Sequence, residues 1–318
     1  MKIHGDNGWE EYPSYLDIVV PRVLEFLKQR ELKITFFIVG QDAALEKNRG
    51  ALAAIAAAGH EIGNHSFRHE PWLHLYSEAD IDAELAQAER SIESVTGVKP
   101  IGFRGPGFSL SEATLNVLHR RGYLYDASTF PTFLGPLARA YYFMTAKLDS
   151  TQRKERKALF GTLGEGLRPL KPYHWRTAEG ELMEIPVTTM PLFKIPFHAS
   201  YLLYLSGYSS ALAMMYFRTA LTMCRVSGTS PSLLLHPLDF LGAEDTQALS
   251  FFPGMSMPSS RKLELMGEVI DQFAMRYTVV NMRTHAEEAA RSARLPRVVP
   301  RFPALQRQRE AFTALPLG

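Results

Sequence analysis

The sequence has little of several features that would point to a particular class of protein. Its 318 residues contain one cysteine, Cys224, so no internal disulfide can form and a reducing compartment is expected. The 35 basic and 33 acidic residues nearly cancel, and a net charge of +2 gives no argument for a nucleic-acid partner. The longest apolar region, 199–224, is interrupted by Ser206, Gly207 and Arg218, so no transmembrane segment is predicted.

The start of the chain lacks the features of a targeting sequence. It opens Met-Lys-Ile-His-Gly-Asp, and no apolar stretch follows the single lysine. We therefore expect no signal peptide and a cytoplasmic location. Cys224 lies in an apolar stretch, which favours a buried structural thiol.

Strand and helix patterns alternate along the chain. Apolar runs rich in β-branched and aromatic residues predict strands at 34–39, 61–63, 101–103, 182–187, 232–235 and 277–281. Helical spacing of apolar residues predicts helices at 15–28, 43–58, 77–96, 111–121, 202–223 and 261–276. Such alternation is typical of an α/β protein with a parallel sheet or barrel, whose functional groups lie at the carboxyl ends of the strands.

The pattern also suggests how the chain is divided. We expect one barrel domain over residues 1–286, interrupted at about 133–180 by an insertion with a charged run and a glycine-rich stretch. The charged run is expected to form a solvated helix face. Residues 287–318 alternate arginine, proline and small residues, which predicts a C-terminal tail.

The strongest single motif is a histidine pair. His65 and His69 follow a short predicted strand and are four residues apart, so both can lie on one face of a helical turn and chelate one divalent cation. Neutral imidazole suits zinc and its first-row neighbours. A spacing of four is common by chance, and the position after a strand is what favours a metal site.

Two other motifs follow predicted strands. Arg104, in Phe-Arg-Gly-Pro-Gly, offers a planar fork of donors that can orient a carboxylate, although an ordinary turn with a surface arginine is the alternative. His236 ends the run Leu-Leu-Leu-His, and its near-neutral pKa would let it protonate a leaving group. A structural histidine is the competing interpretation there.

Together these segments resemble the polysaccharide deacetylase family, which has NodB homology and is also called carbohydrate esterase family 4. The resemblance begins at Thr35-Phe-Phe-Ile-Val-Gly40, which is similar to the T-F-F-x-x-G strand of the family. Gly59-His-Glu-Ile-Gly-Asn-His65 resembles its metal-binding segment. Arg104-Gly-Pro106 matches R-x-P, and Leu233-Leu-Leu-His236 matches L-x-x-H. Asp126-Ala-Ser-Thr-Phe130 resembles D-x-x-x-W, with phenylalanine in place of tryptophan.

The resemblance implies a fold and a set of roles. The fold would be a distorted (β/α)7 barrel of the TIM type. His65 and His69 would bind a divalent metal ion, with zinc as the first expectation. Arg104 would hold the catalytic base, Asp126 would orient a neighbouring group and His236 would act as general acid. The substrate-binding positions implied are Pro106, Gly107, Phe130 and Leu233.

The front of the chain departs from the family pattern. The family begins with an apolar strand that ends in two consecutive acidic residues, the general base and the third metal ligand. Only Met1-Lys-Ile-His-Gly-Asp6 precedes the loop before the first predicted helix, and Asp6 is the only aspartate before Asp17. Asp6 is therefore the candidate for ligand or base. The alternative is a late start or a lost segment, which would leave the barrel without its first strand.

The function implied is removal of N-acetyl groups from an amino sugar, within a glycan or a lipid-linked saccharide. The alternatives are cleavage of another non-peptide C–N bond, a sugar-binding module without activity, and a structural protein with this barrel. Tyr201, Tyr204 and Tyr208 could stack on sugar rings or contact a membrane surface, but core packing of an amphipathic helix is the favoured interpretation.

Overall fold

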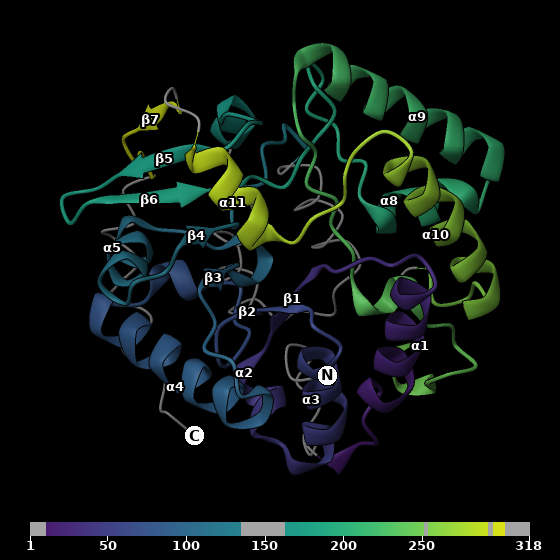
Figure 1. The fold of residues 1–318 in the computed structure, drawn as a ribbon, viewed down its shortest axis with the longest axis horizontal. Coiled ribbons are helices and arrows are strands. Elements are labelled where there is room, and N and C mark those ends of the chain that lie inside the picture. The colour runs from purple at the N-terminus through teal and green to yellow at the C-terminus, as the bar shows by residue number, and fades with distance from the viewer. Residues whose placement is uncertain (1–10, 135–162, 251–253, 292–294, 303–318) are drawn as a thin grey trace, which may run out of the picture.

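The computed structural model of the protein describes residues 11–134, 163–250, 254–291 and 295–302. Asp6 lies outside these ranges, as do residues 135–162 of the expected insertion and residues 303–318 of the expected tail. Within them, the strands of the first half of the chain lie toward the middle of the molecule with helices around them, and the later strands lie at its edge (Figure 1).

One mixed sheet organises the fold. Its strands are β1 (Thr35–Ile38), β2 (Glu61–Asn64), β3 (Gly102–Phe103), β4 (Tyr125–Asp126), β5 (Tyr173–Arg176), β6 (Glu181–Glu184) and β7 (Arg297–Val298). They pair in the order β1-β2-β3-β4-β6-β5-β7, and every pair is parallel except the β5–β6 hairpin. No pairing between the edge strands β1 and β7 closes the sheet within the described ranges. The α/β prediction with a mainly parallel sheet is confirmed.

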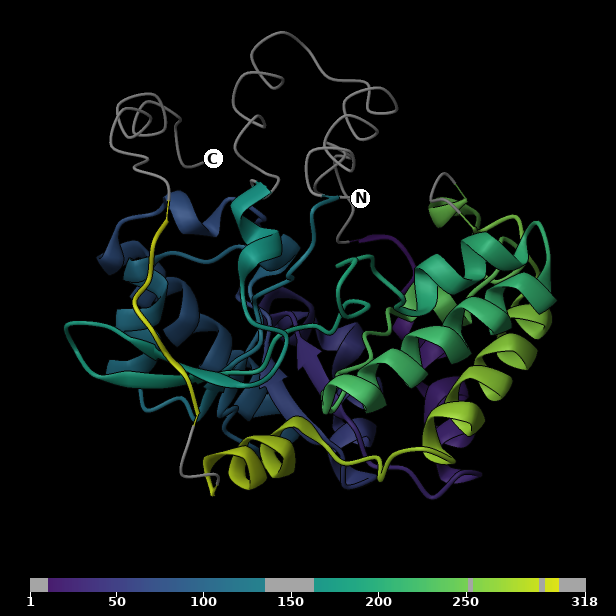
Figure 2. The ribbon, with the colours of Figure 1, turned by 90° about the horizontal axis from the view of Figure 1, so that it is seen from above.

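Helices follow the strands along the chain and pack around the sheet. The α-helices are α1 (Leu16–Lys28), α2 (Gly40–Ala44), α3 (Arg49–Ala57), α4 (Glu78–Thr96), α5 (Glu112–Arg120), α8 (Ala199–Ser206), α9 (Ser210–Ser227), α10 (Ser259–Ala274) and α11 (Met282–Ala290). α1, α3, α4 and α5 contact one another in succession. Figure 2 shows α8, α9 and α10 grouped on the side of the molecule opposite the β5–β6 hairpin.

The core lies between these helices and the strands. Val19 of α1, Ile55 of α3 and Ile62 of β2 are nearly inaccessible to solvent and belong to one cluster with Phe217 of α9. Each such apolar side chain contributes about 1.5–3 kcal/mol of transfer free energy. Cys224 belongs to the same cluster and is fully buried, which confirms the prediction of a structural thiol.

Helix α4 shows how local sequence sets an element's limits. The Ser77 hydroxyl accepts a hydrogen bond from the Asp80 amide at 3.1 Å, which caps the first turn. Gly97 ends the helix with φ of 69°, a left-handed conformation that glycine adopts without steric cost. The predicted helix at 77–96 is thereby confirmed almost to the residue.

Two predicted strands are wrong. Residues 232–235 form no strand, because their backbone contacts are irregular: the Ser232 amide donates to the Thr188 hydroxyl at 2.7 Å. Residues 277–281 also form no strand. The chain contacts β1 just after them, where the Met282 amide donates a hydrogen bond to the side-chain oxygen Oγ1 of Thr35 at 2.8 Å. Apolar runs alone did not distinguish a strand from a buried irregular segment.

Three further features bear on the organisation of the chain. The predicted helix at 202–223 is two helices, because the hydroxyl of Ser209 caps a new helix at the Leu212 amide. Residues from 287 onward, expected to form a tail, begin within α11, and Arg297–Val298 then adds β7 to the sheet edge. Among the described residues, no helix combines the length and hydropathy needed to cross a membrane.

Candidate active site

The parallel strands bring three of the predicted site residues to one edge of the sheet. His65 follows β2, Arg104 follows β3, and Asp126 ends β4. The ladder continues past the strand ends: the His65 amide donates to Ile38 O at 2.9 Å, and the Arg104 amide donates to Asn64 O at 3.0 Å. Functional groups at the carboxyl ends of neighbouring parallel strands lie close together, as the sequence predicts.

The histidine pair is brought together by a turn and not by a helix. The rings of His65 and His69 lie 4.8 Å apart, measured between centroids, at an angle of 61°. Ser66 and His69 have positive φ values of 61° and 57°, so the segment folds back on itself, which corrects the expectation of a helical turn. The Glu84 carboxylate secures the turn by accepting hydrogen bonds from the amides of Phe67 and Arg68.

A hydrogen bond connects the histidine segment (His65–His69) to the arginine loop (Arg104–Phe108). Nδ1 of His65 lies 2.5 Å from the backbone oxygen of Arg104, and only a protonated Nδ1 can donate to a carbonyl. Nε2 is then left without a proton in the neutral ring. Burial lowers the pKa of His65, and burial with the nearby His236 lowers the pKa of His69 to about 4. Both rings are therefore neutral near pH 7, in the form that binds metals.

Arg104 is fixed by two contacts. Its Nε donates to the backbone oxygen of Ala127 at 3.0 Å, and its guanidinium carbon lies 4.5 Å from the centre of the Phe37 ring. Burial lowers its pKa to about 10, against the opposing influence of Tyr125 and Asp126. The side chain keeps its positive charge at neutral pH.

Glycine and proline shape the loop that follows Arg104. The loop contains the short 3-10 helix η5 (Pro106–Phe108). A Cβ on Gly105 would lie 2.0 Å from the backbone oxygen of Ser109, which no side chain tolerates. Gly107 has φ of 58°, and a Cβ there would lie 2.9 Å from Cβ of Pro71. Pro106 is buried, whereas Gly107 is exposed, so the loop presents Gly107 at the surface and Pro106 to the interior.

Asp126 is linked to the arginine loop by hydrogen bonds through Ser128. Its Oδ1 accepts a hydrogen bond from the Ser128 hydroxyl, and that hydroxyl accepts one from the Gly105 amide at 2.7 Å. Asp126 is fully buried and lies in register with Glu184 of β6. Burial and the charge of Glu184 raise the pKa of Asp126.

Glu184 was not identified from the sequence. It is fully buried, and its carboxylate accepts hydrogen bonds from the amide and hydroxyl of Thr129 and from Trp175 Nε1 at 2.8 Å. The sequence feature that could have identified Glu184 is its position as an acidic residue within an apolar predicted strand.

Aromatic rings form one wall of the site. Phe130 stacks on Phe108 with centroids 4.6 Å apart and an interplanar angle of 25°. On its other side lies His198, 5.7 Å away, which in turn lies 4.6 Å from Tyr201 and 5.9 Å from His236. Phe108 and His198 were not predicted from sequence; neither stands in a motif with recognisable spacing.

His236 lies next to this wall. Its side chain is 47% exposed, and its ring lies 5.9 Å from that of His198, measured between centroids. The charge that His236 can carry adds to burial in lowering the pKa of His65 and His69. Leu233 is partly buried and packs against the main core. The geometry thus brings together His65, His69, Arg104 and His236, with Phe130 beside them.

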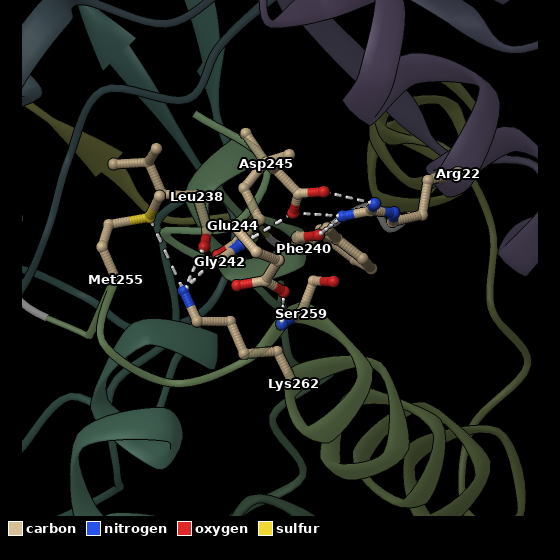
Figure 3. A network of polar contacts seen from close by, with 10 residues as sticks. Arg22, Leu238, Phe240, Gly242, Glu244, Asp245, Met255, Ser259 and Lys262 are labelled. Carbon is tan, nitrogen blue, oxygen red and sulfur yellow. Dashed lines mark hydrogen bonds and ion pairs between the residues drawn. The ribbon is translucent and has the colours of Figure 1, made fainter. Parts of the chain in front are cut away.

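A network of polar contacts anchors the loop after His236, as Figure 3 shows. This loop contains the 3-10 helix η8 (Pro237–Phe240). Nζ of Lys262, on α10, donates to the backbone oxygens of Leu238 at 2.8 Å and Leu241 at 2.6 Å. Arg22 of α1 donates to Phe240 O and forms a two-pronged ion pair with Asp245, each contact at 2.7 Å.

Two tyrosines differ from the favoured expectation: Tyr204 in α8 and Tyr208 in the turn after it. They are 62% and 74% exposed, with their hydroxyls 3.1 Å apart, so the prediction of core packing is wrong for both. The helix buries Leu202, Leu203 and Ser206 instead. Tyr201 is partly buried, in contact with His198.

Comparison with known proteins shows which family the first part of the chain resembles. Residues 6–125 match the family model described as polysaccharide deacetylase. The chain is 29% identical over 131 residues to the peptidoglycan deacetylase of Helicobacter pylori, a match that covers 39% of this chain and 44% of that protein. It is 34% identical over 144 residues to a peptidoglycan deacetylase-like protein of Gibberella zeae, covering 44% of this chain and 40% of that one. The chain spans less than half the length of both relatives.

The fold is similar to a crystal structure of a provisionally assigned polysaccharide deacetylase from Mycobacterium smegmatis. The TM-score is 0.60 at 22% identity, over 91% of this chain and 82% of that one. This likeness concerns the fold alone, and it agrees with the predicted distorted (β/α)7 architecture. The matched segment contains the histidine pair and the arginine loop. Residues 6–125 of this chain are thus similar to the polysaccharide deacetylase family.

Proposed function

We propose that this chain is a metal-dependent hydrolase that removes N-acetyl groups from an amino sugar of a glycan. One observation supports this most directly. The rings of His65 and His69 lie side by side, and the first is tied to the backbone of Arg104 by a hydrogen bond from Nδ1. Two metal-binding nitrogens and a cation are thereby combined at one edge of the sheet, with His236 in the same neighbourhood.

The two imidazoles fit a divalent cation. Both are neutral, and the Nδ1 contact of His65 leaves its Nε2 lone pair for a metal. Catalytic zinc has three protein ligands as a rule. Among the described residues no third His, Cys, Asp or Glu completes such a group, and Asp6, the proposed third ligand, lies outside them. A bound divalent ion would polarise the acetyl carbonyl and lower the pKa of a water molecule.

The chain's own groups supply the remaining chemistry. Hydrolysis adds water to the acetyl carbon, breaks the C–N bond and leaves acetate and a free amino sugar. The departing nitrogen needs a proton, which His236 is placed to give. We assign Asp6 as the base that takes the proton of the water, with the Arg104 cation to hold its carboxylate.

The aromatic wall suits an N-acetylated sugar. Phe108 and Phe130 are both partly exposed, and His198 continues that wall toward His236. Exposed apolar ring surfaces of this kind pack against the acetyl methyl group and the C–H face of a pyranose ring. Peptidoglycan deacetylases among the relatives support a glycan built from N-acetylated amino sugars as substrate.

The test is acetate release from N-acetylglucosamine oligomers and from peptidoglycan, with zinc-reconstituted protein. The wild-type chain is expected to release acetate. The His236→Ala variant should lose roughly 10²–10⁴-fold in rate, as expected for removal of a general acid. His65→Ala should lose activity with the metal, whereas His119→Ala, on α5, serves as the matched control and should retain it.

The result also distinguishes the alternatives. Binding of the sugars without any acetate release would favour a sugar-binding module without hydrolytic activity. Release of ammonia or amine from small non-peptide amides, with none from N-acetylated sugars, would favour cleavage of another C–N bond. Neither binding nor hydrolysis would contradict the proposal altogether.

A further inference from the structure

Two side chains, those of Ser200 and Asp239, lie near Nδ1 of the His236 imidazole. The Ser200 hydroxyl, in the first turn of α8, lies 3.2 Å from Nδ1 of His236 and 2.8 Å from Oδ1 of Asp239. The other carboxylate oxygen, Oδ2, accepts the His236 amide at 2.7 Å and lies 3.8 Å from Nδ1. Ser200 therefore bridges the ring and the carboxylate.

We propose that Ser200 and Asp239 are positioning residues that hold His236 with its neutral-state proton on Nδ1. An ionised carboxylate can only accept, so the single hydrogen of the Ser200 hydroxyl points to Asp239. The serine oxygen is then free to accept from Nδ1–H of His236. Nε2, which has no hydrogen-bond partner within the described residues, is left for the substrate.

Several neighbours of Asp239 limit the effect of its burial. Asp239 is 3% exposed, and burial raises its pKa, while the charge of His236, the His236 amide, the Ser200 hydroxyl and the Lys262 ammonium oppose that shift. Lys262 is held beside it by the backbone oxygens of Leu238 and Leu241, within the network of Figure 3. These two hydrogen bonds restrict the position of the Lys262 ammonium group.

Other groups near His236 do not offer the same support. Arg104 lowers the pKa of His236 through its charge, and His198, His65 and His69 are neutral rings in the same neighbourhood. Asp126, the carboxylate that the family resemblance assigns to an orienting role, is bonded to Ser128 instead. Within the described residues the backbone amide of Asp239 is a competing donor, because it bonds to His236 O at 3.0 Å and also faces the His236 side chain in the capping box that opens η8.

This inference rests on the proposed role of His236 and gives that role a structural basis. When Nε2 gives its proton to the departing amine, the neutral ring that remains carries its proton on Nδ1. Ser200 accepts from that tautomer, and Asp239 accepts from the Ser200 hydroxyl, so the pair stabilises the product of proton transfer. They act through His236 and need not contact the substrate.

The experiment reads the tautomer directly and needs no turnover. Long-range ¹H–¹⁵N spectra of the intact chain, with ¹⁵N-labelled histidine, identify which nitrogen of His236 carries the proton above its pKa. Wild type should show the Nδ1–H form. Ser200→Ala and Asp239→Asn should shift His236 to the Nε2–H form, and Ser200→Thr, which keeps the hydroxyl, should restore Nδ1–H.

Two results would overturn the inference: an Nε2–H ring in the wild type, with Nδ1 accepting from the Asp239 amide, or a tautomer unchanged by Ser200→Ala. Ser200→Ala removes no buried charge, so it keeps the test available where Asp239→Asn fails to fold. In the acetate assay, Ser200→Ala should lower kcat roughly tenfold at unchanged KM, the effect of one lost hydrogen bond to a charged ring. A wild type with the Nδ1–H form but no acetate release would refute the proposed function and leave this inference intact.

Discussion

Nδ1 of His65 lies 2.5 Å from the backbone oxygen of Arg104, so the histidine segment and the arginine loop form one unit. The contact fixes the neutral ring of His65 with Nε2 free of a proton. It also makes the position of the His65 ring, a proposed metal ligand, depend on the conformation of the loop after β3. Changes in that loop are therefore expected to affect metal binding without touching either histidine.

The first prediction concerns the side chain of Arg104. Arg104→Lys removes the Nε contact to Ala127 O and the planar contact with Phe37. We expect a loss of about 1–3 kcal/mol in the free energy of unfolding, together with weaker zinc binding. Urea denaturation and zinc titration measure the two effects. Arg90→Lys, at an exposed position of α4, is the matched control; equal stability and zinc affinity for both variants would contradict the account.

The second prediction concerns the loop backbone. Gly105→Ala would place a methyl group 2.0 Å from the Ser109 backbone oxygen, and forcing that loop apart should cost about 1–3 kcal/mol. Gly50→Ala is the opposite case: nothing lies within 4 Å of a Cβ there, and alanine should stabilise α3 by up to about 1 kcal/mol. Thermal denaturation of both variants should give shifts of opposite sign. Shifts of the same sign would show that the loop conformation is not as described.

The third prediction concerns the dependence of stability on pH. The pKa of Asp126 is raised in the folded state, so the folded chain keeps this proton at pH values where the unfolded chain has lost it. This group's contribution to stability is therefore full below about pH 4 and declines as the pH rises, by at most about 1.4 kcal/mol per unit.

Asp126→Asn removes that decline, because the amide stays neutral at all pH values. Relative to the wild type, the variant should gain stability between about pH 4 and 7. Chemical denaturation at four or five pH values measures the difference, with Asp17→Asn as a control. A difference that is independent of pH would contradict a raised pKa.

The fourth prediction concerns the anchor of the His236 loop. Lys262→Met removes the lysine donor from the backbone oxygens of Leu238 and Leu241. Leu238 O keeps the Leu241 amide at 3.4 Å, so the loss of a partner for Leu241 O should dominate and cost about 1–3 kcal/mol. Lys28→Met, at an exposed position of α1, should change stability by less than about 0.5 kcal/mol. Hydrogen exchange should also show faster opening of residues 236–241. An unchanged exchange rate there would mean that Lys262 does not hold the loop.

Much of the sheet was predictable because its strands are short, apolar and followed by glycine or by chemically distinctive residues. β1, β2, β3 and the helix capped by Ser77 follow directly from that pattern. The sequence did not reveal the irregular run before His236. A continuous apolar stretch such as 232–235 satisfies the criterion for a buried strand equally well whether it pairs in a ladder or not.

The site was predictable in composition and less so in geometry. Spacing and position identified His65, His69, Arg104 and His236, but the histidines meet through positive φ values at Ser66 and His69, which no periodicity encodes. The groups that support these residues come from distant parts of the chain. Asp239 is the exception, since His236-Pro-Leu-Asp239 places a carboxylate three residues after the histidine, a signal that could have been used.

The central claim, that the histidine pair binds a metal for hydrolysis, is tested most directly by the metal content of the purified chain. Elemental analysis after zinc reconstitution and removal of free metal should give about one equivalent per chain in the wild type, and almost none in His65→Ala. It should also give about one equivalent in the His119→Ala control. Wild-type protein that retains no zinc, or that retains the same amount as His65→Ala, would contradict the account.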